Sequence, residues 1–209
     1  GESTPIRPTL PLSAPAPAPR PAATPVAPTP LRDSLAGDRV VRIMGIVNGT
    51  TNYILDRMDR EGADFADVLA DAQRLGYAEA DPTFDVEGID AAHKLAILAS
   101  VAFGGEVNFD AVHVEGIRHI SPVDMQFAEE LGYRIKLLGL ASRTGKGIEQ
   151  RVHPCMVPER TAIAHVDGVL NAVVAEGDFV GTTTFEGPGA GEGPTASAVV
   201  SDLADIARG

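Results

Sequence analysis

The chain has 209 residues, enough for one sizeable core, and a formal net charge of −12 from 17 basic and 29 acidic residues. Because nucleic-acid binding relies on clustered Lys and Arg, this balance argues against a nucleic-acid partner. The sequence has no run of 18 apolar residues, so we expect no membrane span, and its single cysteine, Cys155, excludes an internal disulfide and favours a cytoplasmic location.

The first 29 residues differ in composition from the remainder of the chain. Ten of the 16 prolines fall within residues 1–30, where alanine is also frequent. Closely spaced prolines remove amide donors and favour extended backbone. We therefore predict a disordered Pro/Ala-rich segment at 1–29 and one domain at 30–209. A ligand for a proline-binding module is the alternative, but the composition favours a spacer.

Apolar periodicity and capping residues predict the elements of the first half of the domain. In chain order they are a short polar helix at 31–37, a strand at 40–47, a helix from the turn at 48–51 to Gly62, a helix at 67–76 that begins at Asp64 or Asp67, a polar loop at 77–89 and a buried helix at 91–104.

β-Branched residues and turn signals predict that strands dominate the second half. We expect strands at 112–117, 133–143, 148–157 and 171–187, a short helix at 123–131, and a last helix at 194–208 that follows the glycine-rich loop 187–193. The predicted fold is α+β, with an antiparallel or mixed β-sheet covered by helices.

Residues that can carry chemistry concentrate between Glu79 and Lys94, where the chain reads EADPTFDVEGIDAAHK. If Asp90 opens the helix, Lys94 lies one turn further along the same face, within reach of the carboxylate. A lysine at the start of an apolar helix is partly desolvated and is suited to proton transfer. From spacing alone, an ordinary surface ion pair is the alternative. A calcium loop fails because the closing bidentate Glu is missing.

The segment from Ala72 to Lys94 resembles the homoserine dehydrogenase signature at every fixed position. Three further segments, GIVNGTTNYIL, RVHPCMVP and GPGAGEGPTASAVVSDL, resemble family segments in family order. The resemblance therefore covers Pro30 to Gly209 and implies the fold of the substrate-binding and catalytic domain of that enzyme.

The resemblance implies NAD(P)-dependent interconversion of L-homoserine and L-aspartate 4-semialdehyde, a step towards threonine, isoleucine and methionine. Lys94 matches the family's proton-transfer lysine, and Asp90 matches the acid that orients it and helps to bind substrate. Glu79 and Asp85 resemble the carboxylates that hold the substrate ammonium group. These roles suit the residue types, because the alkoxide left by hydride transfer must take up a proton.

Two more groups of residues follow from the resemblance. Thr50 and Tyr77 are expected to line the substrate site, although plain turn chemistry is an equal alternative for Thr50 without the family match. Gly189, Ala190 and Gly191 are expected to contact the cofactor, NAD(P), because glycines allow close approach of a nucleotide.

In the family a preceding βαβ domain binds the dinucleotide, and this sequence supplies no counterpart, so we expect little or no turnover from this chain alone. We still expect a homodimer and weak homoserine binding. A non-catalytic amino-acid-binding or dimerisation module derived from the enzyme is the alternative. We predict no metal site, because the five histidines are scattered and the family's sodium-binding loop is not matched.

Overall fold

The computed structural model describes Leu31, Leu35 and residues 37–208. The segment predicted to be disordered, 1–29, lies outside the described residues, as does most of the helix expected at 31–37. The proposed domain boundary at residue 30 therefore stays a prediction. Within the described residues, no helix is long and apolar enough to cross a membrane.

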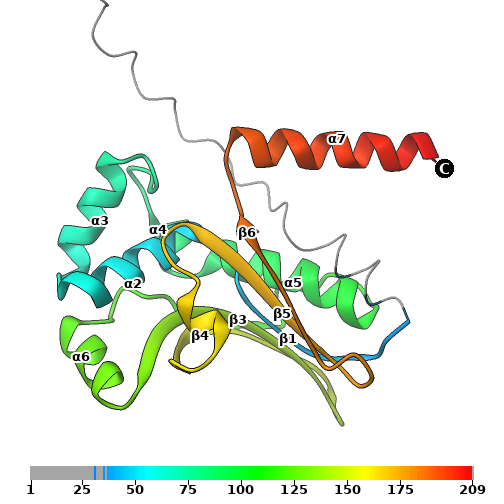
Figure 1. The fold of residues 1–209 in the computed structure, drawn as a ribbon, viewed down its shortest axis with the longest axis horizontal. Helices are drawn as coiled ribbons and strands as arrows, with labels where there is room; N and C mark the ends of the chain where they lie inside the picture. The colour runs from blue at the N-terminus through cyan, green and yellow to red at the C-terminus, as the bar shows by residue number, and fades with distance from the viewer. Residues whose placement is uncertain (1–30, 32–34, 36, 209) are drawn as a thin grey trace, which may run out of the picture.

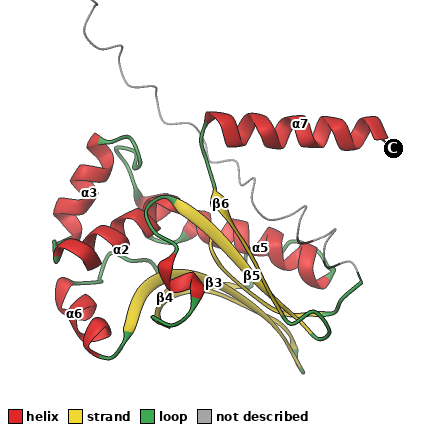
Figure 2. Cartoon of the chain, viewed as in Figure 1, coloured by secondary structure: helices red, strands yellow, loops and turns green. Residues whose placement is uncertain are grey.

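A six-stranded sheet forms the centre of the fold (Figure 2). Its spatial order is β2-β4-β3-β1-β5-β6, and every neighbouring pair is antiparallel except β2 and β4. The strands are β1 (Val40–Ile46), β2 (Val112–Val114), β3 (Tyr133–Thr144), β4 (Gly147–Pro158), β5 (Leu170–Gly177) and β6 (Thr182–Pro188). The expected mixed sheet is confirmed.

Most of the helices pack around this sheet, whereas the last helix stands apart from it (Figure 1). The helices are α2 (Gly49–Glu61), α3 (Phe65–Arg74), α4 (Thr83–Val86), α5 (Ile89–Phe103), α6 (Pro122–Glu130), the 3-10 turn η1 (Ala162–His165) and α7 (Glu192–Arg208). The α+β class is confirmed.

Several predicted boundaries were wrong in detail. Asp64, one of the two expected starts, is the N-cap of the third predicted helix, which ends at Arg74 and not at Gly76. Asp67 lies in its first turn, where the positive end of the helix stabilises a carboxylate. The polar loop at 77–89 contains the short helix α4. The run at 171–187 is divided into two strands by a turn, and α7 begins at Glu192, two residues earlier than expected.

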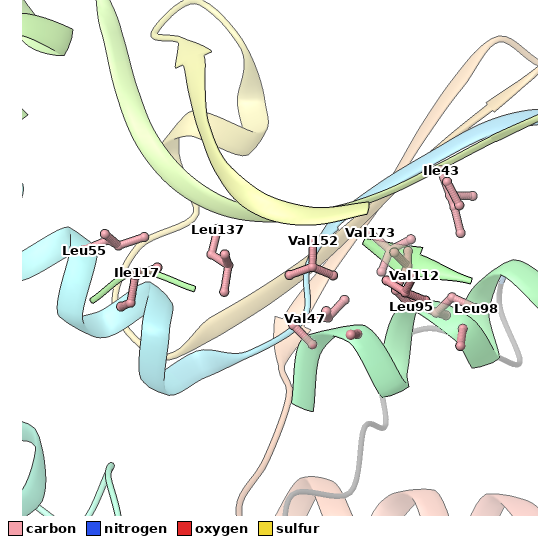
Figure 3. Packing of buried hydrophobic residues seen from close by; sticks show 14 of the residues in the cluster. Ile43, Val47, Leu55, Leu95, Leu98, Val112, Ile117, Leu137, Val152 and Val173 are labelled. Atoms are coloured by element: carbon pink, nitrogen blue, oxygen red, sulfur yellow. The ribbon is translucent and has the colours of Figure 1, made fainter. Parts of the chain in front are cut away.

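The main core lies between α2, α5 and one face of the sheet (Figure 3). Leu95 and Leu98 of α5 are buried against strand residues such as Val152 and Val173. Alanines on the same side of α5 let the helix lie close to the strands. At Gly139 of β3 a Cβ atom would lie only 3.3 Å from Leu95 Cδ1, so the absence of a side chain leaves room for Leu95.

The opposite face of the sheet carries a smaller apolar cluster. Ile46, Leu138 and Val174 are buried there, while Leu140 is only partly covered. Cys155 belongs to this face, and burial raises the pKa of its thiol to about 11. A thiol that holds its proton this firmly is a weak nucleophile, so Cys155 contributes to packing on this face.

One lysine is buried at the end of the sheet. Lys136 of β3 is 2% exposed, and its ammonium donates hydrogen bonds to the Val166 carbonyl at 2.8 Å and to Asn52 Oδ1 at 3.3 Å. Its Nζ atom lies 3.7 Å from a carboxylate oxygen of Asp167. Burial lowers the pKa of Lys136, with Asp167 acting in the opposite direction. These contacts join β3, α2 and the segment before β5.

Candidate active site

The site is built where β1 leaves the sheet and α2 begins. Asn48 is the N-cap of α2, and its side-chain oxygen accepts hydrogen bonds from the Thr51 amide at 2.8 Å and the Thr51 hydroxyl at 2.9 Å. At Gly49 a Cβ atom would lie 2.7 Å from the Val169 carbonyl oxygen, so a glycine lets the segment before β5 pack against the first turn of α2.

The predicted pair of Asp90 and Lys94 is formed at the start of α5. Lys94 Nζ lies 2.7 Å from Asp90 Oδ2 and donates a second hydrogen bond, of 3.1 Å, to the Val47 carbonyl. The two side chains are only 11% and 15% exposed. The alternative of an ordinary surface ion pair therefore does not fit, because solvent screening at this pair is weak.

Asn48 connects this pair to a second carboxylate. Its Nδ2 atom donates to Asp85 Oδ1 at 2.7 Å and to Asp90 Oδ2 at 2.8 Å. One buried amide therefore caps α2 and holds two acids from α4 and α5 together. The local sequence identifies Asn48 only as a turn residue, because its acid partners lie 37 and 42 residues further along the chain and leave no local signal.

The surroundings of Asp85 increase its affinity for a proton. Burial raises the pKa of Asp85, and the nearby charges of Asp90 and Glu79 act in the same direction, while the hydrogen bond from Asn48 and the charge of Lys94 oppose the rise. Asp85 therefore holds a proton more readily than an exposed aspartate does. A positively charged ligand group placed beside it would favour the ionised carboxylate.

An aromatic stack fixes α4 against α5 on the outer side of the acids. The His93 ring is stacked on Phe109 at a centroid distance of 4.0 Å and an interplanar angle of 5°, and Phe84 lies 5.7 Å from it. The His93 ring therefore packs against aromatic side chains, although His93 is next to Lys94 in the sequence. Phe84 precedes Asp85 in α4, so the stack restrains the position of that carboxylate.

Three more predicted residues lie at the edge of this cluster. The Thr50 hydroxyl donates to the Tyr77 carbonyl at 2.7 Å, and the Tyr77 ring lies 4.9 Å from that of Tyr53. Glu79 is exposed, and its backbone carbonyl accepts a hydrogen bond of 2.9 Å from Gln73. Thr50 and Tyr77 therefore contact each other at the start of α2, and Glu79 lies close enough to Asp85 to raise the pKa of that acid.

The predicted cofactor residues lie in a separate loop between β6 and α7. No hydrogen bond within the described part of the chain joins Gly189, Ala190 or Gly191 to the acids or to Lys94. Gly191 has a φ of +124°, a backbone conformation that favours glycine. Gly189 is buried, and a Cβ atom there would overlap the side chain of Asn171. Gly191 therefore leaves its part of the loop free of a side chain, whereas the space beside Gly189 is filled by Asn171.

Comparison with known proteins gives consistent matches. The family model for homoserine dehydrogenase matches residues 25–204. A homoserine dehydrogenase of Neisseria gonorrhoeae is 58% identical over 178 residues, which are 85% of this chain and 41% of that protein. A homoserine dehydrogenase of Helicobacter pylori is 52% identical over 178 residues, 85% of this chain and 42% of its own length. The chain thus spans about two fifths of these relatives.

Solved structures agree with the sequence matches. A homoserine dehydrogenase from Thiobacillus denitrificans superposes with a TM-score of 0.87 and 56% identity, covering 90% of this chain and 44% of that one. A hyperthermophilic archaeal homoserine dehydrogenase in complex with NADPH gives a TM-score of 0.70 at 33% identity, with 83% of this chain and 49% of that chain covered.

Proposed function

Because this chain belongs to the homoserine dehydrogenase family, we propose that it supplies the substrate side of a dehydrogenase that interconverts L-homoserine and L-aspartate 4-semialdehyde with NAD(P). The observation that carries the proposal is the partly buried pair of Lys94 and Asp90, joined through Asn48 to Asp85. Such an arrangement suits a small molecule that bears both an ammonium group and a hydroxyl group.

Lys94 is proposed to move the proton of the substrate hydroxyl. Two of its three N–H donors are occupied by Asp90 and the Val47 carbonyl, which leaves one for a substrate oxygen. When hydride reaches the aldehyde carbon, the oxygen becomes an alkoxide, and an oriented ammonium group can protonate it. In the reverse direction, Lys94 in its neutral form accepts the proton.

The acids and the start of α2 are proposed to hold the amino-acid end of the substrate. Asp85 and Glu79 offer carboxylate oxygens for the ammonium group, which forms stronger hydrogen bonds with charged acceptors. The first backbone N–H groups of α2, near Thr50, lie at the positive end of a 13-residue helix and suit the substrate carboxylate. Tyr77 would border the same end, because Thr50 bonds its carbonyl.

The glycine loop of Gly189, Ala190 and Gly191 is proposed as this chain's contact with NAD(P), which would supply or accept the hydride. The fit rests on the φ of Gly191, a backbone conformation that favours a residue without a side chain. The relatives are more than twice as long as this chain, so the activity of the whole enzyme goes beyond what these residues carry.

A homodimer formed through the sheet is part of the same proposal. Met44, Leu140 and Leu170 are partly buried apolar residues beside the cluster on the face opposite α5. A second sheet face would remove them from water. Light scattering after size exclusion would report a dimer, and Leu140→Asp would give monomers. Val107→Asp, in an exposed loop, should leave the mass unchanged, whereas a monomeric parent protein would contradict the proposal.

Calorimetric titration with L-homoserine tests the substrate site. We expect binding that falls at least tenfold in Lys94→Ala and in Glu79→Gln, since each removes one polar contact of about 1.4 kcal/mol or more. L-2-Aminobutyrate, which lacks the hydroxyl, should discriminate less between wild type and Lys94→Ala. Arg74→Ala, on the exposed end of α3, is the control. A stable folded dimer without any homoserine binding would instead favour a structural dimerisation module.

A further inference from the structure

Four buried side-chain atoms make no hydrogen bond within the described part of the chain, and the carboxamide oxygen of Asn171 is one of them. Asn171 lies in β5 and is 4% exposed, and its side-chain oxygen makes no hydrogen bond within the described residues. Buried polar groups are nearly always hydrogen-bonded, because an unpaired one forfeits its contacts with water. The free acceptor of Asn171 therefore needs an explanation.

Asn171 lies next to the end of β1, where the Val47 carbonyl binds Lys94. This carbonyl is called the anchor of Lys94. Alternation along β5 puts Asn171 on the same face as Val173, which belongs to the core under α5. Strands β1 and β5 are antiparallel, and Ile46, the last residue of β1, is paired with Ala172. Val47, which follows Ile46, therefore lies beside Asn171, which precedes Ala172. The Val47 carbonyl accepts the hydrogen bond from Lys94.

On its other side, Asn171 borders the glycine loop. Asn171 is paired with Gly187 of β6, and the Asn171 carboxamide occupies the space that a side chain at Gly189 would need. Gly189 does not adopt a left-handed φ, so steric space and not backbone conformation explains a glycine there. Asn171 thus lies between the anchor of Lys94 and the loop proposed to meet the cofactor.

We propose that the carboxamide oxygen of Asn171 accepts a hydrogen bond from the carboxamide N–H of a nicotinamide ring. The inference rests on the proposed function, and it assigns a recognition role to a residue that the predicted sites did not include. The terminal torsion of asparagine is broad, so a modest rotation turns the oxygen towards a ligand. The absence of a side chain at Gly189 lets the carboxamide lie directly against the glycine loop.

The neighbouring charges favour a neutral donor at Asn171 over the substrate ammonium. The ammonium group has charged acceptors nearby in Asp85 and Glu79, which bind it more strongly than a neutral amide does. The carboxamide of nicotinamide is uncharged and carries two N–H donors, which match an uncharged amide oxygen. A nicotinamide ring at this position would lie beside the anchor of Lys94, where hydride and proton transfer must meet.

Nuclear magnetic resonance on the isotopically labelled chain tests the inference without turnover. Nicotinamide mononucleotide is the probe, and its 3-acetylpyridine analogue, which keeps the carbonyl and lacks the N–H donors, is the control ligand. We expect the probe to shift the Asn171 side-chain amide and the backbone amides of Gly189 and Gly191. The analogue should bind about tenfold more weakly, the effect of one lost hydrogen bond.

Two variants sharpen the test. Asn171→Leu removes the acceptor and keeps a side chain of similar volume. Gly189→Ala leaves Asn171 in place, but its added methyl group pushes the carboxamide aside. If one variant fails to fold, the other still tests the inference. Each should bind the two ligands equally, while Asn108→Ala, in an exposed loop, should keep the preference. Each of three results would overturn the inference: an Asn171 side-chain signal that does not shift, equal affinity of the wild-type chain for the two ligands, or no binding of the probe. Titration with L-homoserine in the same samples reports separately on the substrate site.

Discussion

Helices α5 and α7 have similar lengths, 15 and 17 residues, yet their apolar side chains have opposite environments. In α5, Leu95, Leu98 and several alanines are buried against the sheet. In α7, the four large apolar residues are each more than half exposed, and the helix stands clear of the sheet (Figure 1). They are Val199, Val200, Leu203 and Ile206. Apolar content alone therefore does not determine burial, which depends on whether a complementary surface faces the helix.

The largest expected effect is a cavity under α5. Leu95→Ala removes a buried side chain that packs beside Gly139, so the free energy of unfolding should fall by about 2–5 kcal/mol. Urea denaturation followed by circular dichroism measures the change. Ile97→Ala, on the exposed side of the same helix, should alter it by less than about 0.5 kcal/mol. Equal losses in the two variants would refute the assigned orientation of α5.

Hydrogen bonds from Asn48 to Asp85 and Asp90 hold the first turn of α5 in place. Asn48→Ala loses the cap of α2 and the hydrogen bonds to Asp85 and Asp90, so the free energy of unfolding should fall by about 2–3 kcal/mol. L-Homoserine should also bind more weakly. Ser121→Ala removes only the cap of α6, which should weaken stability by about 1 kcal/mol with homoserine affinity unchanged. Unaltered homoserine binding in Asn48→Ala would argue against the bridging role.

The pH dependence of stability tests the environment of Asp85. Because burial raises its pKa in the folded protein, the protonated carboxyl stabilises the fold at pH values below the pKa of the unfolded chain. That contribution is lost as the pH rises through the folded-state pKa. Asp85→Asn carries no such titration, so its stability relative to wild type should increase over this range. Denaturation curves at several pH values would show the trend, and a constant difference would contradict it.

The smallest effect is expected in α7. Leu203→Ala should change the free energy of unfolding by less than about 0.5 kcal/mol, because the side chain is 60% exposed. Hydrogen exchange should be faster in α7 than in α5, since few buried contacts protect its amides. Strong protection of α7 in the isolated chain would show that its apolar face is covered in solution.

The sequence was sufficient for the parts of the site that are local. Asp90 and Lys94 are four residues apart on one helix, and helical geometry alone brings them together. The α+β class and most strands followed from periodicity and turn residues. The short helix α4 was missed because four residues carry no periodic signal.

Contacts between distant segments could not be read from the sequence. Asn48 reaches acids on α4 and α5, and Asn171 meets the glycine loop, only after the sheet has aligned β1, β5 and β6. The exposure of α7 was likewise unpredictable, since its amphipathic pattern resembles that of a helix packed on a sheet. Register and layer order decide these features.

Because the ammonium group of Lys136 is buried, its chemical reactivity reports whether the chain is folded. The sequence contains three lysines, of which Lys146 is exposed in the hairpin between β3 and β4 and Lys94 is mostly covered. An amine-reactive label should attach first to Lys146 and reach Lys136 only when the sheet opens. Mass spectrometry of the labelled peptides would then distinguish intact from damaged molecules in one preparation.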